Sequence, residues 1–407
     1  MKNTIQNRLG KVYKINNPIN FIYLYSIILF GLLNTSCKKN ETANKQTKDA
    51  ERSVTHPSAK GTIHLSDIII EATPLSLEAT ENSLILNGGV NLSTNETSIY
   101  IGGMGQDLVQ FNKKTGTFIR QIGKKGEGPG EYNQATSLFA SEDALYVVDS
   151  MVGKIQSFNS QGVYLSQLQN PLLRNVGKIY VFNNKIYLNL TYGSHDYIFA
   201  TIDLDLKNLQ TYSDNLIAQQ QDMSRYETYK RHGYLNSQFF TIGNELHWSY
   251  TLLKDIQQIN TKPKIALAAK TTIPSPYFYE PIPPLPPAIQ ITLNDSWKKF
   301  NEKYSFYAAY LLKNRFLIRK FQYTDTNNTP HNKYHIYDTK TNKQYNVEPD
   351  FFIYENVKED SFTVKGFPNF IYADADYIYE LDFSFTKKDV LDNPILRRYK
   401  INEDFFN

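Results

Sequence analysis

The feature that most constrains the fold is a unit of four short strands that recurs along the chain. Its clearest copy, residues 134–168, reads "QATSLFASEDALYVVDSMVGKIQSFNSQGVYLSQL". Apolar and polar residues alternate in runs of four to eight, and Gly, Asn, Asp and Ser separate the runs, as in antiparallel strands joined by tight turns. Gln161-Gly162 forms one two-residue turn, and Thr115-Gly116 occupies the same place in an earlier copy. The pattern therefore predicts an all-β protein.

Six copies of the unit can be counted by their second strands. These strands begin near Ile99, Leu145, Ile186, Leu246, Phe316 and Ile378. The spacing runs from 41 residues, between Leu145 and Ile186, to 70 residues, between Leu246 and Phe316. Four-stranded units that recur every ~40–50 residues, with insertions, are typical of β-propellers. We predict a six-bladed β-propeller of four-stranded blades over residues 61–407; the alternative is two stacked β-sandwiches.

The last copy of the unit lacks one strand, and a strand-like segment near the N-terminus lacks a unit. This segment, residues 62–72, reads "TIHLSDIIIEA". We predict that it completes the last blade, so that the two ends of the chain close the ring and leave no open sheet edge. Two insertions interrupt the pattern: residues 214–236, which are polar, and residues 273–300, which begin with a proline-rich run unsuited to a central strand.

The first 37 residues have the pattern of a targeting segment. A basic start precedes a short apolar run, Phe21–Leu33, and Cys37, the only cysteine of the chain, follows closely. This order resembles the lipobox of bacterial lipoproteins, although Asn34 stands where that motif usually has an aliphatic residue. The resemblance implies a signal peptide over residues 1–37 and a lipid on Cys37. The alternative is an ordinary cleaved signal with an incidental cysteine.

Residues 38–60 are polar, and we predict a flexible tether between the lipid and the propeller. Cleavage before Cys37 removes four of the 44 basic side chains and none of the 40 acidic ones, so the remaining chain is close to neutral. Nucleic-acid binding depends on basic surfaces that neutralise phosphates, so we expect no nucleic-acid partner. We expect a lipoprotein of the bacterial cell envelope that contacts the membrane through its lipid anchor.

A glycine-rich stretch, Ile122–Tyr132, reads "IGKKGEGPGEY" and lies between the first and second copies of the unit. A phosphate-binding loop would need a lysine followed by serine or threonine, and then a helix. Here a strand follows, so we interpret the stretch as a corner between two blades. In a propeller such corners share one face with the turns between second and third strands. We predict a face for a ligand or partner at Lys124, Lys125, Glu127, Glu131, Tyr132 and Asp149.

This glycine-rich stretch, with the "LYVVDS…GKIQSFNSQGVYL" run that follows it, resembles the six-bladed β-propeller lipoproteins of Bacteroidota, with NHL-like or TolB-like blades. The close resemblance covers about residues 98–170. It implies a propeller on a lipid anchor. It carries over no catalytic residue, because that family is largely without an assigned activity.

We therefore expect a binding or scaffold protein for a protein, peptide or glycan partner, rather than an enzyme. Tyrosine and tryptophan in the two insertions could anchor such a partner. The alternative is a metal-dependent hydrolase or lactonase at the mouth of the channel. Asp149, Asp374 and Asp376 end or follow predicted inner strands and could offer oxygen ligands there. We predict no bound cofactor and no metal ligands, with a divalent cation at the channel mouth left open by this alternative.

Overall fold

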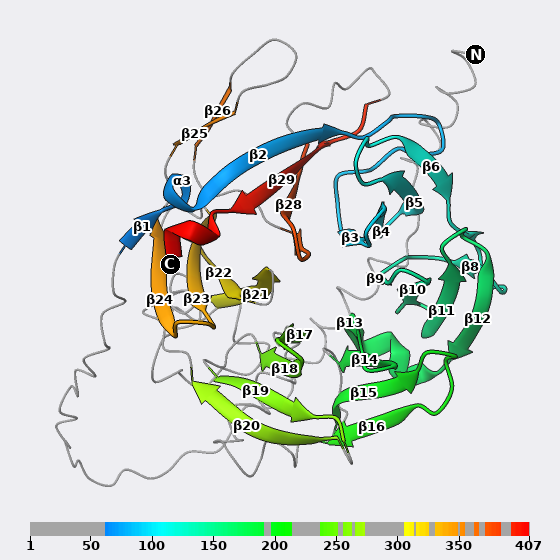
Figure 1. Ribbon diagram of the computed structural model, residues 1–407. Coiled ribbons are helices and arrows are strands. Elements are labelled where there is room, and N and C mark those ends of the chain that lie inside the picture. The colour runs from blue at the N-terminus through cyan, green and yellow to red at the C-terminus, as the bar shows by residue number, and fades with distance from the viewer. Residues whose placement is uncertain are drawn as a thin grey trace, which may run out of the picture. The chain divides into compact units, whose positions relative to one another are not determined.

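The computed structural model describes residues 62–190, 197–213, 237–250, 255–262, 265–272, 305–312, 315–324, 330–348, 351–354, 362–365, 371–383 and 392–406. All of them belong to one compact unit, Thr55–Asn407. Six sheets of mainly antiparallel strands stand as blades in a ring (Figure 1), so the predicted six-bladed propeller is confirmed and the two-sandwich alternative is excluded. The targeting segment, the tether and the insertions 214–236 and 273–300 lie outside the described residues.

Each of the first three blades is built from four strands that are consecutive in sequence, with the first strand innermost. Blade 1 contains β3 (Val90–Thr94), β4 (Ser98–Gly103), β5 (Gln106–Asn112) and β6 (Phe118–Gln121). Blade 2 contains β9 (Ser137–Ala140), β10 (Ala144–Asp149), β11 (Lys154–Asn159) and β12 (Tyr164–Gln169), and the 3-10 turn η1 (Pro171–Asn175) follows. Blade 3 contains β13 (Val176–Phe182), β14 (Lys185–Leu190), β15 (Tyr197–Asp203) and β16 (Gln210–Ser213).

The last three blades follow the same order, with additions near the chain ends. Blade 4 contains β17 (Ser237–Ile242), β18 (Glu245–Tyr250), β19 (Asp255–Asn260) and β20 (Ala266–Thr272). Blade 5 contains β21 (Ser305–Leu312), β22 (Phe316–Thr324), β23 (Pro330–Asp338) and β24 (Lys343–Glu348), with β1 (Thr62–His64) as a fifth strand. Blade 6 contains β27 (Tyr372–Ala373), β28 (Ile378–Asp382), β29 (Ile395–Ile401) and β2 (Ile69–Ser76). Outside the blades lie two short pairs, β7 (Lys124–Lys125) with β8 (Glu131–Tyr132) and β25 (Phe351–Tyr354) with β26 (Phe362–Lys365), and the turns α3 (Leu65–Ile68) and η2 (Glu403–Phe406).

The core lies between the blades, because each blade buries both of its faces. In β10, Tyr146 and Val148 pack in the apolar cluster shared with blade 3, whereas Leu145 and Val147 pack in the cluster shared with blade 1. Successive side chains of a strand point to opposite faces, so a strand between two neighbours is apolar at nearly every position. This explains the run "LYVV" in the sequence.

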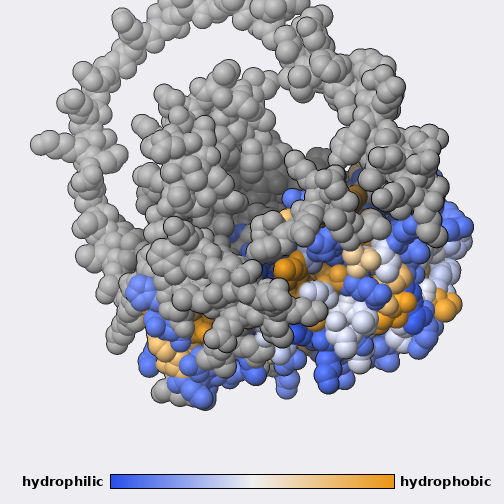
Figure 2. All heavy atoms as spheres, turned by 90° about the horizontal axis from the view of Figure 1, so that it is seen from above, coloured by the Kyte–Doolittle hydropathy of each residue, from blue (hydrophilic) through white to orange (hydrophobic). Residues whose placement is uncertain are grey.

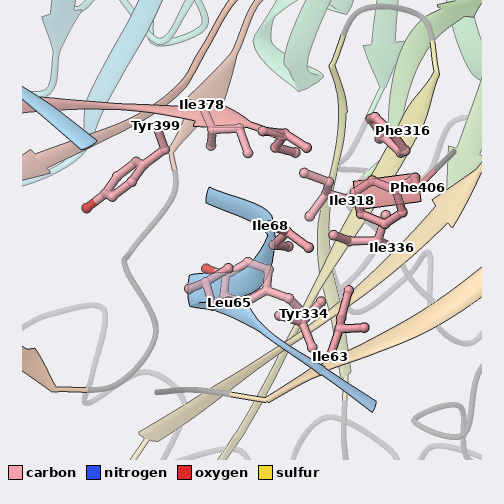
Figure 3. Close-up of a cluster of buried hydrophobic side chains, with 12 residues drawn as sticks. Ile63, Leu65, Ile68, Phe316, Ile318, Tyr334, Ile336, Ile378, Tyr399 and Phe406 are labelled. Atoms are coloured by element: carbon pink, nitrogen blue, oxygen red, sulfur yellow. The ribbon is translucent and has the colours of Figure 1, made fainter. Parts of the chain in front are cut away.

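The N-terminal segment closes the ring, as predicted, but it is divided between two blades. β2 pairs antiparallel with β29 and becomes the outermost strand of blade 6, whereas β1 pairs parallel with β24 of blade 5. The single turn α3 joins them, and Leu65 and Ile68 of this turn point into a cluster of buried side chains between the two blades (Figure 3). The prediction that all of residues 62–72 completes the last blade is therefore corrected for β1.

The described surface seen in Figure 2 is hydrophilic over most of its area, and hydrophobic residues form small groups between the hydrophilic ones. No helix among the described residues is long and apolar enough to cross a membrane.

Candidate functional site

The innermost strands of the six blades enclose a cavity of about 400 Å³. Each of the strands β3, β9, β13, β17, β21 and β27 contributes to its wall, so the cavity occupies the central channel of the ring. Pockets that bind small molecules usually have volumes of about 300–1,000 Å³. The channel is therefore a candidate binding site.

Lys178 brings a positive charge to this wall. Val176 pairs with Leu190 and Lys178 with Asn189, so Gly177 is an extra residue that makes a bulge in β13. A bulge bends its strand and changes the direction of the neighbouring side chain. Lys178 is exposed to the cavity, and desolvation by the surrounding protein lowers the pKa of its ammonium group below the ordinary value.

Next to Lys178, the wall offers aromatic rings and hydroxyl groups. The rings of Phe139 and Tyr180 meet edge to face, with centroids 5.5 Å apart. The Tyr180 hydroxyl lies 3.1 Å from Oγ1 of Thr241, a hydrogen bond that joins blades 3 and 4. Burial raises the pKa of Tyr180, so this hydroxyl is neutral at pH 7. The wall can therefore pack against a flat or apolar group and also contact a polar one.

Asp374 is the acidic residue of the wall, and protein groups occupy both of its oxygens. Oδ2 forms an ion pair with Lys113 at 2.8 Å and accepts hydrogen bonds from Thr94 at 2.7 Å and Tyr379 at 2.6 Å. Oδ1 accepts the backbone N–H of Asp376 at 2.8 Å. Burial opposes ionisation, but the hydrogen bonds from Lys113, Tyr379 and Thr94 outweigh it and hold the pKa of Asp374 below its ordinary value. Asp374 thus joins blade 6 to blade 1.

Asp149 has a similar structural setting at the end of β10. It is fully buried, and its carboxylate accepts the backbone N–H groups of Asn133 at 2.6 Å and Met151 at 3.1 Å. Such bonds are typical of an aspartate that shapes a turn. Within the described part of the chain, no group of three or more His, Cys, Asp or Glu is placed to hold a metal ion.

The glycine-rich corner, Ile122–Tyr132, connects blades 1 and 2 and folds around the ammonium group of Lys154. Nζ donates to the backbone carbonyl oxygens of Glu127 at 3.1 Å, Gly128 at 3.2 Å and Glu131 at 2.6 Å. Lys154 is only 1% exposed. The carbonyl groups of the corner therefore face a cation of the protein itself.

The glycine N–H groups of the same corner have protein acceptors. The bonds run from Gly126 to the Tyr132 carbonyl at 3.1 Å, from Gly128 to Oε2 of Glu131 at 2.9 Å, and from Gly130 to Oε1 of Gln156 at 3.0 Å. A phosphate loop presents such N–H groups to its ligand instead. The arrangement agrees with the sequence-based interpretation of a corner between blades.

The structure brings together the five corner residues that the sequence predicted for a partner face. Lys124 and Glu131 form an ion pair at 3.0 Å. Lys125 donates to the Gln106 carbonyl at 3.0 Å, and its ammonium lies 5.9 Å from the centre of the Tyr132 ring. Glu127 is exposed.

Tyr132 is fully buried, and its hydroxyl donates to the Ile122 carbonyl at 3.0 Å and accepts the Leu108 N–H at 2.8 Å. Burial raises its pKa. Neither the corner residues nor Asp149 belong to the cavity wall. Their role on a partner face stays a prediction, and Cys37 lies outside the described residues.

Sequence reasoning missed both lysines that organise these two places. Lys154 and Lys178 each sit in a strand whose local pattern, a lysine beside alternating apolar residues, is ordinary. The bulge at Gly177 was the one available signal, because a glycine inside a strand often marks such an irregularity. Which strand edge faces the channel becomes clear only when the ring is closed.

Comparisons with known proteins agree with the fold. A solved protein from Bacteroides fragilis, assigned as exported, has a TM-score of 0.54 at 17% identity, covering 84% of this chain and 97% of its own. A member of the DUF4221 family from Bacteroides vulgatus has a TM-score of 0.52 at 13% identity, covering 82% of this chain and 98% of its own. No curated protein matches the sequence. The family described as "Domain of unknown function (DUF4934)" matches residues 46–402, and the chain belongs to this family.

Proposed function

We propose that this chain is a lipid-anchored binding protein of the bacterial cell envelope. A protein, peptide or glycan partner inserts one of its groups into the channel cavity. The observation that carries the proposal is the cavity of about 400 Å³ to which all six innermost strands contribute. Its wall combines aromatic rings, hydroxyl and amide groups with a single lysine that has no ion pair among the described residues, as expected for a site that orients a ligand through a few polar contacts.

The envelope location rests on the N-terminal sequence. A basic start, a short apolar run and Cys37 form the pattern of a lipoprotein leader, and the polar residues 38–60 provide a tether. The Bacteroides fragilis protein of similar fold is assigned as exported, which supports the same location for this chain.

The glycine-rich corner extends the proposed binding surface. Lys124, Lys125 and Glu127 are exposed, so they can contact a partner larger than the cavity. Glu131, Tyr132 and Asp149 support the corner from within, through the hydrogen bonds described above. We assign the three exposed residues to the partner face, and half-buried Glu131 with buried Tyr132 and Asp149 to the shape of that face.

A substitution at the mouth of the channel tests the proposal. Ala375 is exposed and belongs to the cavity wall, so Ala375→Trp should obstruct the entrance without disturbing the core. Lys114→Trp, at an exposed turn of blade 1, is the matched control. The full-length protein in detergent would be applied to arrays of peptides and polysaccharide fragments. We expect ligands that bind the native protein and the Lys114→Trp control to lose binding to Ala375→Trp.

Two results would contradict this function. Ligands that bind Ala375→Trp as well as the native protein would show that the channel is not the binding site. A stoichiometric divalent ion in protein purified without added metal, together with hydrolysis of esters or lactones, would favour the hydrolase alternative. Metal content is measured by mass spectrometry on the same preparation.

A further inference from the structure

The cavity wall has one charge that no described residue balances. Among the described residues of the wall, two are charged at pH 7, Asp374 and Lys178. Asp374 is neutralised by Lys113 at 2.8 Å. Lys178 forms no ion pair or hydrogen bond with any of the described residues. The wall, together with Lys113, therefore carries a net charge of about one positive unit.

The backbone of blade 3 sets the position of Lys178 in the cavity wall. The bulge at Gly177 sets Lys178 opposite Asn189, and both side chains belong to the cavity wall. Tyr180 lies two residues further along β13, on the same side of the strand as Lys178. Its ring meets Phe139, and its hydroxyl is fixed by Thr241, so the aromatic neighbours of the lysine are ordered.

Lys178 is exposed to the cavity, the surrounding protein disfavours the charged form of its ammonium group, and no carboxylate among the described residues compensates the charge. A ligand that brings a negative charge into the cavity supplies the missing counter-charge. A single lysine matches a singly charged anion better than a phosphate, which carries up to two charges and has three or more oxygens that take several donors.

We propose that Lys178 binds the carboxylate of a ligand that enters the channel, while the flat or apolar part of that ligand packs against Phe139 and Tyr180. This inference deepens the proposed binding function and rests on it. The carboxylate can belong to the C-terminus of a peptide or to an acidic sugar, since both present the same group to the lysine.

The pH dependence of binding follows from the groups that line the channel. Asp374 stays ionised because its pKa is lowered, and Tyr180 and Tyr372 stay neutral because burial raises theirs. Lys178 is left as the group of the wall that titrates on the alkaline side, with a pKa lowered by burial. A carboxylate favours the protonated lysine, so affinity should be full below the Lys178 pKa and fall as pH rises through it.

The experiment compares matched acidic and neutral probes on the full-length protein by ligand-observed NMR. N-acetylphenylalanine and its amide stand for a peptide C-terminus, and glucuronate and glucose stand for an acidic and a neutral sugar. We expect one acid to bind about tenfold or more tightly than its neutral partner, as a charge-assisted hydrogen bond implies. The acid that binds identifies the source of the carboxylate.

Variants assign the preference to Lys178. Lys178→Met should weaken binding of the acid about tenfold or more, Lys178→Arg should largely retain it, and Lys114→Met, at an exposed turn, should leave it unchanged. Folding of each variant is checked by its urea midpoint. Lys178→Met should not lower it, because Lys178 is exposed and makes no hydrogen bond or ion pair with the described residues.

Several results would overturn the inference. The first two are an acid that binds no more tightly than its neutral partner, and an acid that binds Lys178→Met as tightly as the native protein. The other two are an affinity for the acid that does not fall at alkaline pH, and no binding of either acid at millimolar concentration. If neutral probes bind and Ala375→Trp blocks them, the binding function stands and the role of Lys178 fails. If the array ligands bind Ala375→Trp as well as they bind the native protein, the proposed binding function of the channel is itself wrong.

Discussion

Lys154→Met should lower the stability of the propeller by about 2–4 kcal/mol, because it removes the cation around which the glycine-rich corner folds. Methionine has a similar length and fits the same space, but it has no donor. Three hydrogen bonds from Nζ are lost, to the carbonyl oxygens of Glu127, Gly128 and Glu131.

The magnitude depends on what each carbonyl keeps. Glu131 still accepts Nε2 of Gln156 at 2.8 Å, and Gly128 still accepts the N–H of Glu131 at 3.0 Å. Bonds from a charged donor contribute about 1.5–3 kcal/mol each. Against them stands the burial of the ammonium, which lowers the pKa of Lys154 despite the opposing effect of Asp149, Glu131 and Glu127. The free energy lost with the three bonds, minus the desolvation cost that disappears with the ammonium group, leaves a net loss of about 2–4 kcal/mol.

Urea unfolding, followed by tyrosine and tryptophan fluorescence, measures this difference. Lys114→Met is the control, because Lys114 is exposed in the turn between β5 and β6, and its loss should cost less than about 0.5 kcal/mol. A similarly small effect of Lys154→Met would refute the reasoning, since it would mean that the carbonyl groups of the corner gain nothing from the buried cation.

Three further substitutions test the ring closure and the anchor. Asp374→Asn should cost about 2 kcal/mol at pH 7 by removing the ion pair with Lys113. The folded pKa of Asp374 is lowered, so this contribution is present above the unfolded carboxylate pKa and is lost as pH falls through the folded one; urea midpoints of the two proteins that fail to converge in acid would contradict it. Gly116→Ala should cost about 2 kcal/mol or more, because φ is +74° and the new Cβ would lie 2.1 Å from the carbonyl oxygen of Ser76; a midpoint equal to that of the native protein would refute this contact. Cys37→Ala should abolish labelling with palmitate in cells, and a variant that still labels would refute the anchor.

The turns show why the blades could be predicted from sequence. Gly116 and Gly162 both have positive φ, +74° and +75°. In each turn an asparagine at the end of the preceding strand accepts backbone N–H groups of the turn through its side chain. Those asparagines are Asn112 and Asn159. The chemistry of such turns is local, so the sequence reveals it directly. The alternating strands between them are equally local, and six repeats of one local pattern specify a propeller.

The candidate site could not be predicted in the same way. Lys178 and Phe139 lie in different blades, and only the closed ring brings both to one cavity. The sequence instead drew attention to Asp149, whose position at a strand end is compatible with either a turn or a ligand. In the structure, the Asp149 carboxylate accepts hydrogen bonds from backbone N–H groups, as in a residue that shapes a turn. Residue type and spacing describe one blade well, but a channel is a property of all six.

The junction of blades 6 and 1 shows how ring closure and the channel depend on each other. On the outside, β2 completes blade 6, and Leu75 of β2 packs with Leu396 of β29 in the cluster shared with blade 1. On the inside, Asp374 binds Lys113 and Thr94 of blade 1 across the same junction. Apolar contacts therefore stabilise the outer side of the junction, and ionic and hydrogen-bond contacts stabilise its channel side. Because Asp374 is committed to this junction, it balances Lys113 and is not free to balance Lys178, so the positive charge of the cavity is a consequence of how the ring is closed.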